Sequence, residues 1–165
     1  MLKGFHAAAG ALTLVATTAE ASTYDSAEQS GTATDYRNEL TLQAGLLPGA
    51  SILGLEYVRL LHPYFEIAGS ASYGFTADGA VTPRLRLPIR DRTSLSIGAG
   101  PSVAFDKGGV GETARWYPQA LVEMELTHVT VEHWCLQARI GVAIAREDMS
   151  TTTLPFAGIG VGRAL

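Results

Sequence analysis

Residues 64–75 read YFEIAGSASYGF, a stretch in which the odd-numbered residues are apolar or glycine and the even-numbered ones include Glu66, Ser70 and Ser72. Successive side chains of a β-strand point to opposite faces of the sheet, so this period of two predicts a strand with one apolar and one polar face. Which face meets water decides between a soluble sheet protein and one that lies in lipid.

The same period recurs in segments that are separated by turn signals. Asp78-Gly79 is a typical hairpin turn, and Pro48-Gly49, His62-Pro63 and Gly108-Gly109 are further breaks. The segments cover residues 39–47, 51–61, 64–75, 80–89, 93–105, 115–127, 131–145 and 154–165. Eight strands joined by hairpins predict an all-β fold, an antiparallel up-and-down barrel, because eight strands close around an interior that side chains just fill.

Length and composition limit the other fold classes. The 165 residues suit one domain, and no run of 18 apolar residues follows the N-terminal region, although 47% of the residues are hydrophobic. A net charge of −4 gives no basic footprint for nucleic acid. Cys135 is the single cysteine, so no disulfide forms within the chain.

The N-terminal region has the pattern of a secretory leader. Lys3 precedes a mildly apolar run over residues 5–15, and Ala19-Glu20-Ala21 fits a small-x-small cleavage site. We therefore expect a signal peptide over residues 1–21, a polar lead-in over residues 22–38 and a barrel domain over residues 39–165.

Charged side chains lie on the polar faces of the expected strands. Counted from the turns, they fall at similar heights, so acids and bases can pair if these faces point inward. With these faces turned outward, Arg84 and Arg86 would each cost about 2–4 kcal/mol near the middle of a bilayer. The sequence thus predicts an apolar exterior in lipid and an ionic network inside, formed by Glu56, Glu66, Arg84, Arg86, Glu123, Glu125 and Arg139.

Aromatic residues on the apolar faces also sort by height along the expected barrel. Tyr73, Phe75, Phe105 and Trp116 fall near one rim, whereas Phe65 and Trp134 fall near the other. Aromatic girdles at the two interfaces are typical of membrane barrels. We expect these six residues to mark the membrane boundaries.

Through its leader, strand count, alternation and mixed-charge interior, the chain resembles the small eight-stranded outer-membrane barrels of the OmpA/OmpX type over residues 39–165. The resemblance implies a transmembrane β-barrel in the outer membrane of a Gram-negative envelope, with the lipid bilayer as its partner. It also implies that the N-terminus is periplasmic. Pro48, Asp78-Gly79 and residues 106–114 and 146–153 would then lie outside the cell.

No catalytic, cofactor or metal site is predicted, because the histidines lack ligand spacing and Glu123 and Glu125 are better explained as partners of arginine. We expect a non-enzymatic barrel with a plugged polar interior and a role in envelope integrity or loop-mediated interaction. Two alternatives stay open. One is a narrow pore gated by the charged cluster, and the other is a soluble, secreted lipocalin-like barrel that holds a small apolar ligand inside.

Overall fold

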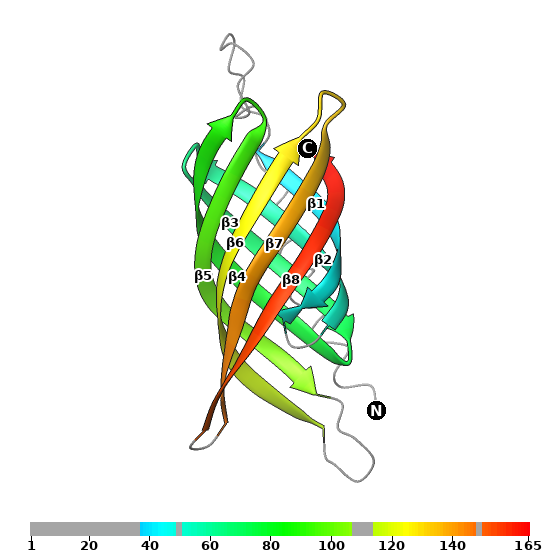
Figure 1. Ribbon diagram of the computed structural model, residues 1–165, viewed down its shortest axis with the longest axis vertical. Coiled ribbons are helices and arrows are strands. Elements are labelled where there is room, and N and C mark those ends of the chain that lie inside the picture. The colour runs from blue at the N-terminus through cyan, green and yellow to red at the C-terminus, as the bar shows by residue number, and fades with distance from the viewer. Residues whose placement is uncertain (1–36, 49–50, 107–113, 148–149) are drawn as a thin grey trace.

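A computed structural model describes residues 37–48, 51–106, 114–147 and 150–165 as a closed barrel of eight antiparallel strands (Figure 1). The predicted leader and nearly all of the predicted lead-in fall outside the described residues. The strands are β1 (Asn38–Leu47), β2 (Ser51–His62), β3 (Phe65–Gly74), β4 (Thr76–Arg90), β5 (Thr93–Asp106), β6 (Arg115–Val129), β7 (Trp134–Glu147) and β8 (Ser150–Ala164).

Each strand pairs with its sequence neighbours, and β1 pairs with β8 to close the barrel. Glu39 lies opposite Ala164 at one end of this closing ladder, and Leu46 lies opposite Ala157 at the other. The predicted all-β, up-and-down architecture is confirmed. No helix in the described part of the chain is long and apolar enough to cross a membrane.

The barrel has two unlike ends. The turn end carries the tight β2–β3, β4–β5 and β6–β7 connections together with Asn38 and Ala164, the first and last strand residues. The loop end carries the other four connections. There the β5–β6 and β7–β8 hairpins extend beyond the remaining strands (Figure 1).

Two predicted turns at the loop end are wrong. Asp78 and Gly79 lie inside β4, opposite Ser72 and Ala71, and the chain turns around Phe75 instead. Asp78 points inward, where its carboxylate accepts a hydrogen bond from the Ser102 hydroxyl at 2.7 Å, and this contact favours a paired strand over a turn.

The predicted loop over residues 146–153 is also largely strand. Arg146 lies opposite Thr151, and Glu147 lies opposite Ser150. The threonines that follow Ser150 have a high β-propensity, which is consistent with a longer hairpin.

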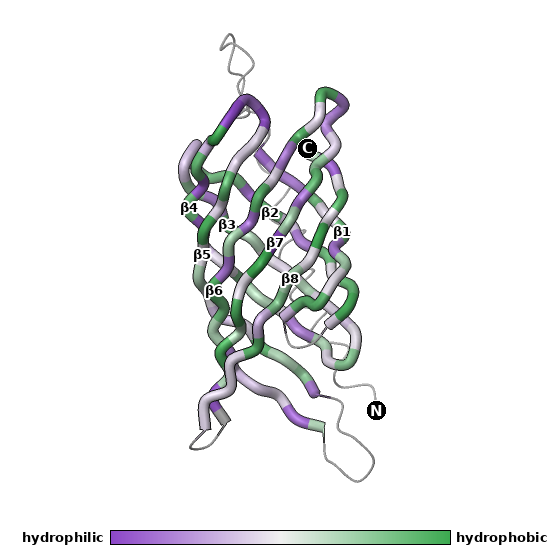
Figure 2. The backbone as a smooth tube through the Cα atoms, viewed as in Figure 1, coloured by the Kyte–Doolittle hydropathy of each residue, from purple (hydrophilic) through white to green (hydrophobic). Residues whose placement is uncertain are grey.

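The two faces of the sheet differ as the alternation predicts. Leu85, Leu87, Ile97 and Val103 are exposed on the outside, whereas the intervening Arg84, Arg86, Ser96 and Ser102 are buried. Figure 2 shows hydrophobic and hydrophilic segments alternating along the strands. This barrel is therefore polar inside and apolar outside, the reverse of a soluble barrel and the arrangement of a transmembrane one.

Candidate functional site in the barrel interior

Arg84 is the centre of a buried ion network. Its side chain extends from β4, is wholly buried, and lies among glutamates from three other strands. Its Nη2 donates to Glu56 Oε2 at 2.7 Å, its Nε donates to Glu123 Oε1 at 2.7 Å, and its Nη1 donates to Glu125 Oε1 at 3.2 Å. Glu66 Oε1 lies 3.9 Å from Nη1. One guanidinium thus connects β2, β3, β4 and β6 across the interior.

Arg139 on β7 extends the network to the opposite wall. Its Nη1 donates to Glu56 Oε2 at 2.9 Å and to Gln43 Oε1 at 3.2 Å, and its Nη2 is paired with Glu123. Glu56 and Glu123 are therefore each shared between Arg84 and Arg139. Shared, hydrogen-bonded partners are what make buried charges tolerable.

Arg86 forms a second group nearer the turn end. Its Nη1 donates to Glu39 Oε1 at 3.0 Å and to Glu66 Oε2 at 3.3 Å. Glu66 also borders Arg84, so the two groups are continuous. The structure thus brings all seven of the charged residues singled out from the sequence into one connected set.

Sequence reasoning missed Glu39 as a member of this set. Glu39 is 3% exposed and lies on the same face of β1 as Thr41 and Gln43. The alternation of Glu39 with Thr41 and Gln43 could have identified it as an inward residue. However, Glu39 is the first residue of the expected strand, where the alternation is least reliable for assigning a face. With it, the set contains five glutamates and three arginines.

Glycines on neighbouring strands make room for the long side chains. Gly98 lies between Arg84 and Glu123 in the ladder, and a Cβ there would come within 2.5 Å of Arg84 Cγ. Gly141 similarly faces the ring of Phe156, and Gly158 faces a methyl group of Leu47. Glycines therefore alternate with larger residues around the circumference, and the space that they leave lets the arginine side chains cross the interior.

Two buried apolar clusters lie beside the network. Toward the loop end, Ala80, Leu121, Ala143 and Phe156 form a buried cluster, and Arg139 lies over the Phe156 ring at 5.3 Å. Toward the turn end, Val129, Cys135 and Ala164 form a smaller one. Cys135 faces inward there, as its parity predicts. The second cluster is level with Glu39 of the network, because Ala164 lies opposite Glu39 in the closing ladder.

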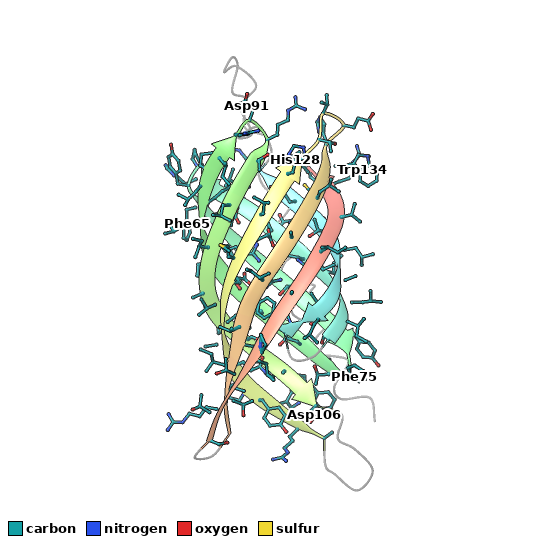
Figure 3. The ribbon with its side chains drawn as sticks, viewed as in Figure 1. Phe65, Phe75, Asp91, Asp106, His128 and Trp134 are labelled. Atoms are coloured by element: carbon teal, nitrogen blue, oxygen red, sulfur yellow. The ribbon has the colours of Figure 1, made fainter. Side chains whose placement is uncertain are left out.

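The six aromatic residues singled out from the sequence lie at the two ends. Phe75 is near the loop end, whereas Phe65 and Trp134 are near the turn end (Figure 3). Phe105 and Trp116 lie opposite each other in the β5–β6 ladder, with ring centroids 4.7 Å apart and planes inclined by 44°. Tyr73 and Trp116 are exposed on the outer surface.

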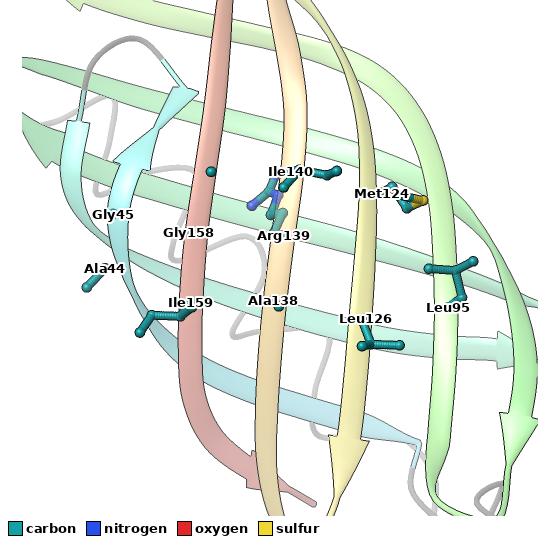
Figure 4. A pocket seen from close by; sticks show the side chains of 11 residues that line it. Ala44, Gly45, Leu95, Met124, Leu126, Ala138, Arg139, Ile140, Gly158 and Ile159 are labelled. Carbon is teal, nitrogen blue, oxygen red and sulfur yellow. The ribbon is translucent and has the colours of Figure 1, made fainter.

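A hollow of about 710 Å³ lies on the outer wall, and Arg139 of the ion network is among the residues that line it (Figure 4). Ala44, Gly45, Ala138 and Ala157 leave space there between larger exposed side chains such as Met124 and Ile159. This surface belongs to the apolar band, and Arg139, the one charged residue of its lining, is buried and already paired with glutamates.

Neither chemical catalysis nor metal binding has an evident location among the described residues. No group of three or more histidine, cysteine, aspartate or glutamate side chains is arranged to hold a metal ion in that part of the chain. His62 and His133 lie in or beside turns, and His128 Nδ1 is 2.9 Å from the Thr93 hydroxyl near the β4–β5 connection.

Comparison with known proteins supports the fold. No family model matches the chain, and no curated protein matches it in sequence. Among solved structures, the Yersinia pestis outer membrane protein Ail, determined in a phospholipid bilayer nanodisc, superposes with a TM-score of 0.52 at 12% identity. The match covers 79% of this chain and 100% of Ail. The chain therefore has the fold of the small eight-stranded outer-membrane β-barrels.

Proposed function

We propose that this protein is an integral, non-enzymatic barrel of the outer membrane, whose interior is plugged by the ion network. The observation that carries the proposal is the position of Arg84, a wholly buried guanidinium that contacts glutamates on three other strands inside an apolar outer wall. Charges so arranged hold opposite walls together, and they leave little of the cross-section of an eight-stranded barrel unfilled.

The packing around the network supports a plugged interior over the narrow-pore alternative. Leu121 and Phe156 belong to a buried apolar cluster on the loop-end side of the network, and Val129 and Cys135 belong to a smaller one at the level of Glu39. An ion crossing the barrel would have to pass these buried side chains and displace an arginine from its glutamates. The pore alternative needs the same network to open as a gate.

The lipocalin-like alternative requires the opposite orientation of the sheet. A cavity for an apolar ligand would need Leu85, Leu87 and Ile97 inside, but these side chains are exposed on the outer wall. Charges fill the interior in their place. The structure therefore argues against this alternative.

A role in envelope integrity or in contact with another molecule would then fall to the barrel surface and its loop end. The loop-end hairpins are the natural place for such contact, because β6 pairs with β7 only from Gln119 onward and β8 pairs with β1 only from Ala157 onward. The protruding parts of β6 and β8 are thus each paired on one side.

Planar-bilayer recording tests the plugged interior. We expect very low conductance from the unaltered protein, and measurably higher conductance from Arg84→Gln combined with Arg86→Gln, because neutral side chains release the glutamates that hold the cluster together. Arg146→Gln, at the loop end and outside the network, serves as the matched control. A large, open pore in the unaltered protein would contradict the proposal.

Membrane integration is tested separately on cell fractions. The protein should remain in carbonate-washed membranes, dissolve in detergent and migrate differently on gels before and after heating, as closed membrane barrels do. Recovery in the soluble periplasmic fraction would refute the membrane assignment.

A further inference from the structure

Arginines surround the turn end of the barrel. The basic rim consists of Arg37 beside the start of β1, Arg59 on β2, Arg90 and Arg92 at the β4–β5 connection, and Arg163 on β8. Outside the interior network, the acidic residues described at this end are Asp91 and Glu132. Counted over the described residues outside the network, the rim therefore has an excess of three positive charges.

The loop end shows a smaller excess. Its described charged side chains on the outside are those of two arginines, Arg115 and Arg146, and one acid, Asp106. Among the described residues the positive charge is thus concentrated at the turn end, although the whole chain has a net charge of −4.

Two members of the rim lie at the edge of the apolar outer surface. Arg163 lies over the ring of Trp134 at 5.5 Å, on the outer surface at the turn end (Figure 3 labels Trp134). Arg59 is half-buried and shares the lipid-facing side of β2 with Leu55 and Tyr57. Arginines among interfacial aromatics place their stems along apolar surface and their charges at the interface.

Arg92 adds a donor without an acceptor. Its Nη1 is buried and has no hydrogen-bond partner among the described residues. A buried, unpaired guanidinium nitrogen is costly, so the Arg92 side chain gains by turning outward to an acceptor such as a phosphate oxygen. The rim thus offers net charge, together with a donor that a headgroup satisfies once this side chain turns outward.

We propose that the basic rim binds the phosphate groups of anionic phospholipids, and that the turn end is enriched in these lipids over zwitterionic ones. The inference rests on the proposed membrane location. Each basic side chain near an anionic surface contributes a preference of about fivefold, and salt screens the preference of the more distant ones. We therefore expect a local preference of about fivefold or more at Trp134.

The chain contains two tryptophans, one at each end, which makes the preference measurable. Trp116→Phe leaves Trp134 to report on the turn end, and Trp134→Phe leaves Trp116 to report on the loop end. Each variant is reconstituted in vesicles that contain either brominated phosphatidylglycerol or brominated phosphatidylcholine. The fluorescence of Trp134 should be quenched preferentially by the brominated phosphatidylglycerol, and that of Trp116 equally by both lipids.

Substitutions assign the effect to the rim. In the Trp116→Phe background, Arg59→Gln with Arg163→Gln should bring the preference at Trp134 close to one, whereas Arg146→Gln should leave it unchanged. Equal quenching of Trp134 by the two lipids would overturn the proposal. Absence of quenching at both tryptophans would instead refute the membrane location itself.

A final experiment distinguishes binding of lipid headgroups from binding of free phosphate. Inorganic phosphate is compared with sodium chloride at the same ionic strength. We expect the two salts to reduce the preference at Trp134 equally, by screening alone. Specific loss of the preference in phosphate would show that the rim binds the free anion, and would overturn the assignment to phospholipid.

Discussion

At the scale of single residues, Arg84 is the side chain whose replacement should cost most. Arg84→Met removes the cation that Glu56, Glu123 and Glu125 share, and leaves Arg139 as the remaining partner of Glu56 and Glu123. Breaking a buried charge cluster in this way costs about 3–5 kcal/mol. We expect a loss of this size in the free energy of unfolding, measured by denaturant titration in lipid vesicles with circular dichroism.

Arg86→Met is the matched comparison, because Arg86 contacts two glutamates and lies nearer the turn end. Its loss of stability should be smaller than that of Arg84→Met. A loss that is equal or larger would show that Arg84 is not the centre of the network.

Gly98 tests the space that the network needs. A Cβ at this position would lie 2.5 Å from Arg84 Cγ and 2.7 Å from the Pro83 carbonyl oxygen. Gly98→Ala should therefore destabilise the barrel by about 1–3 kcal/mol, as overpacking does. Gly79→Ala is the control, since its Cβ would meet nothing closer than the Ser70 carbonyl oxygen at 3.9 Å. Equal effects of the two substitutions in denaturant titration would contradict the steric argument.

At the scale of strands and hairpins, the Phe105–Trp116 pair should stabilise the protruding β5–β6 hairpin. The two residues are directly opposite, with ring centroids 4.7 Å apart. A double-mutant cycle with Phe105→Leu and Trp116→Leu should give a coupling energy of about 0.5–1.5 kcal/mol. As a control, substitutions of Phe105 and Trp134, which lie at opposite ends of the barrel, should have additive effects on stability. A coupling energy of the same size in this control pair would refute a direct contact between Phe105 and Trp116.

The same scale shows where sequence reasoning succeeds and where it stops. Alternation in β5 is enough to place Leu95, Ile97 and Val103 outward, because the period of a strand is fixed by its backbone. Hairpin ends are decided by tertiary pairing, which is why Asp78-Gly79 is strand and the turn is at Phe75. A local turn signal is outweighed when the side chain of its aspartate finds a buried partner.

For the molecule as a whole, eight strands with one apolar and one polar face leave a single way to close the sheet in lipid. Parity within a strand assigns Glu56 or Arg139 to a face, but it does not say which cation reaches which carboxylate. That depends on strand tilt and on the stagger of the ladders, which set heights across the barrel. The role of glycines such as Gly98 and Gly158 is also hard to predict from the sequence, because it depends on which side chain of another strand lies over them.

The sequence separation within the ion network bears on how the barrel enters a membrane. Arg84 reaches Glu123, 39 residues further along the chain, and Arg139 reaches Glu56, 83 residues earlier. A strand that crossed the bilayer alone would carry its charges without these partners, at a cost of a few kcal/mol for each arginine. Insertion is therefore expected to be concerted, with the strands associating at the membrane surface before the charged positions cross it. The network would then raise the kinetic barrier to insertion of partly assembled sheets, and would thereby favour insertion of fully assembled barrels.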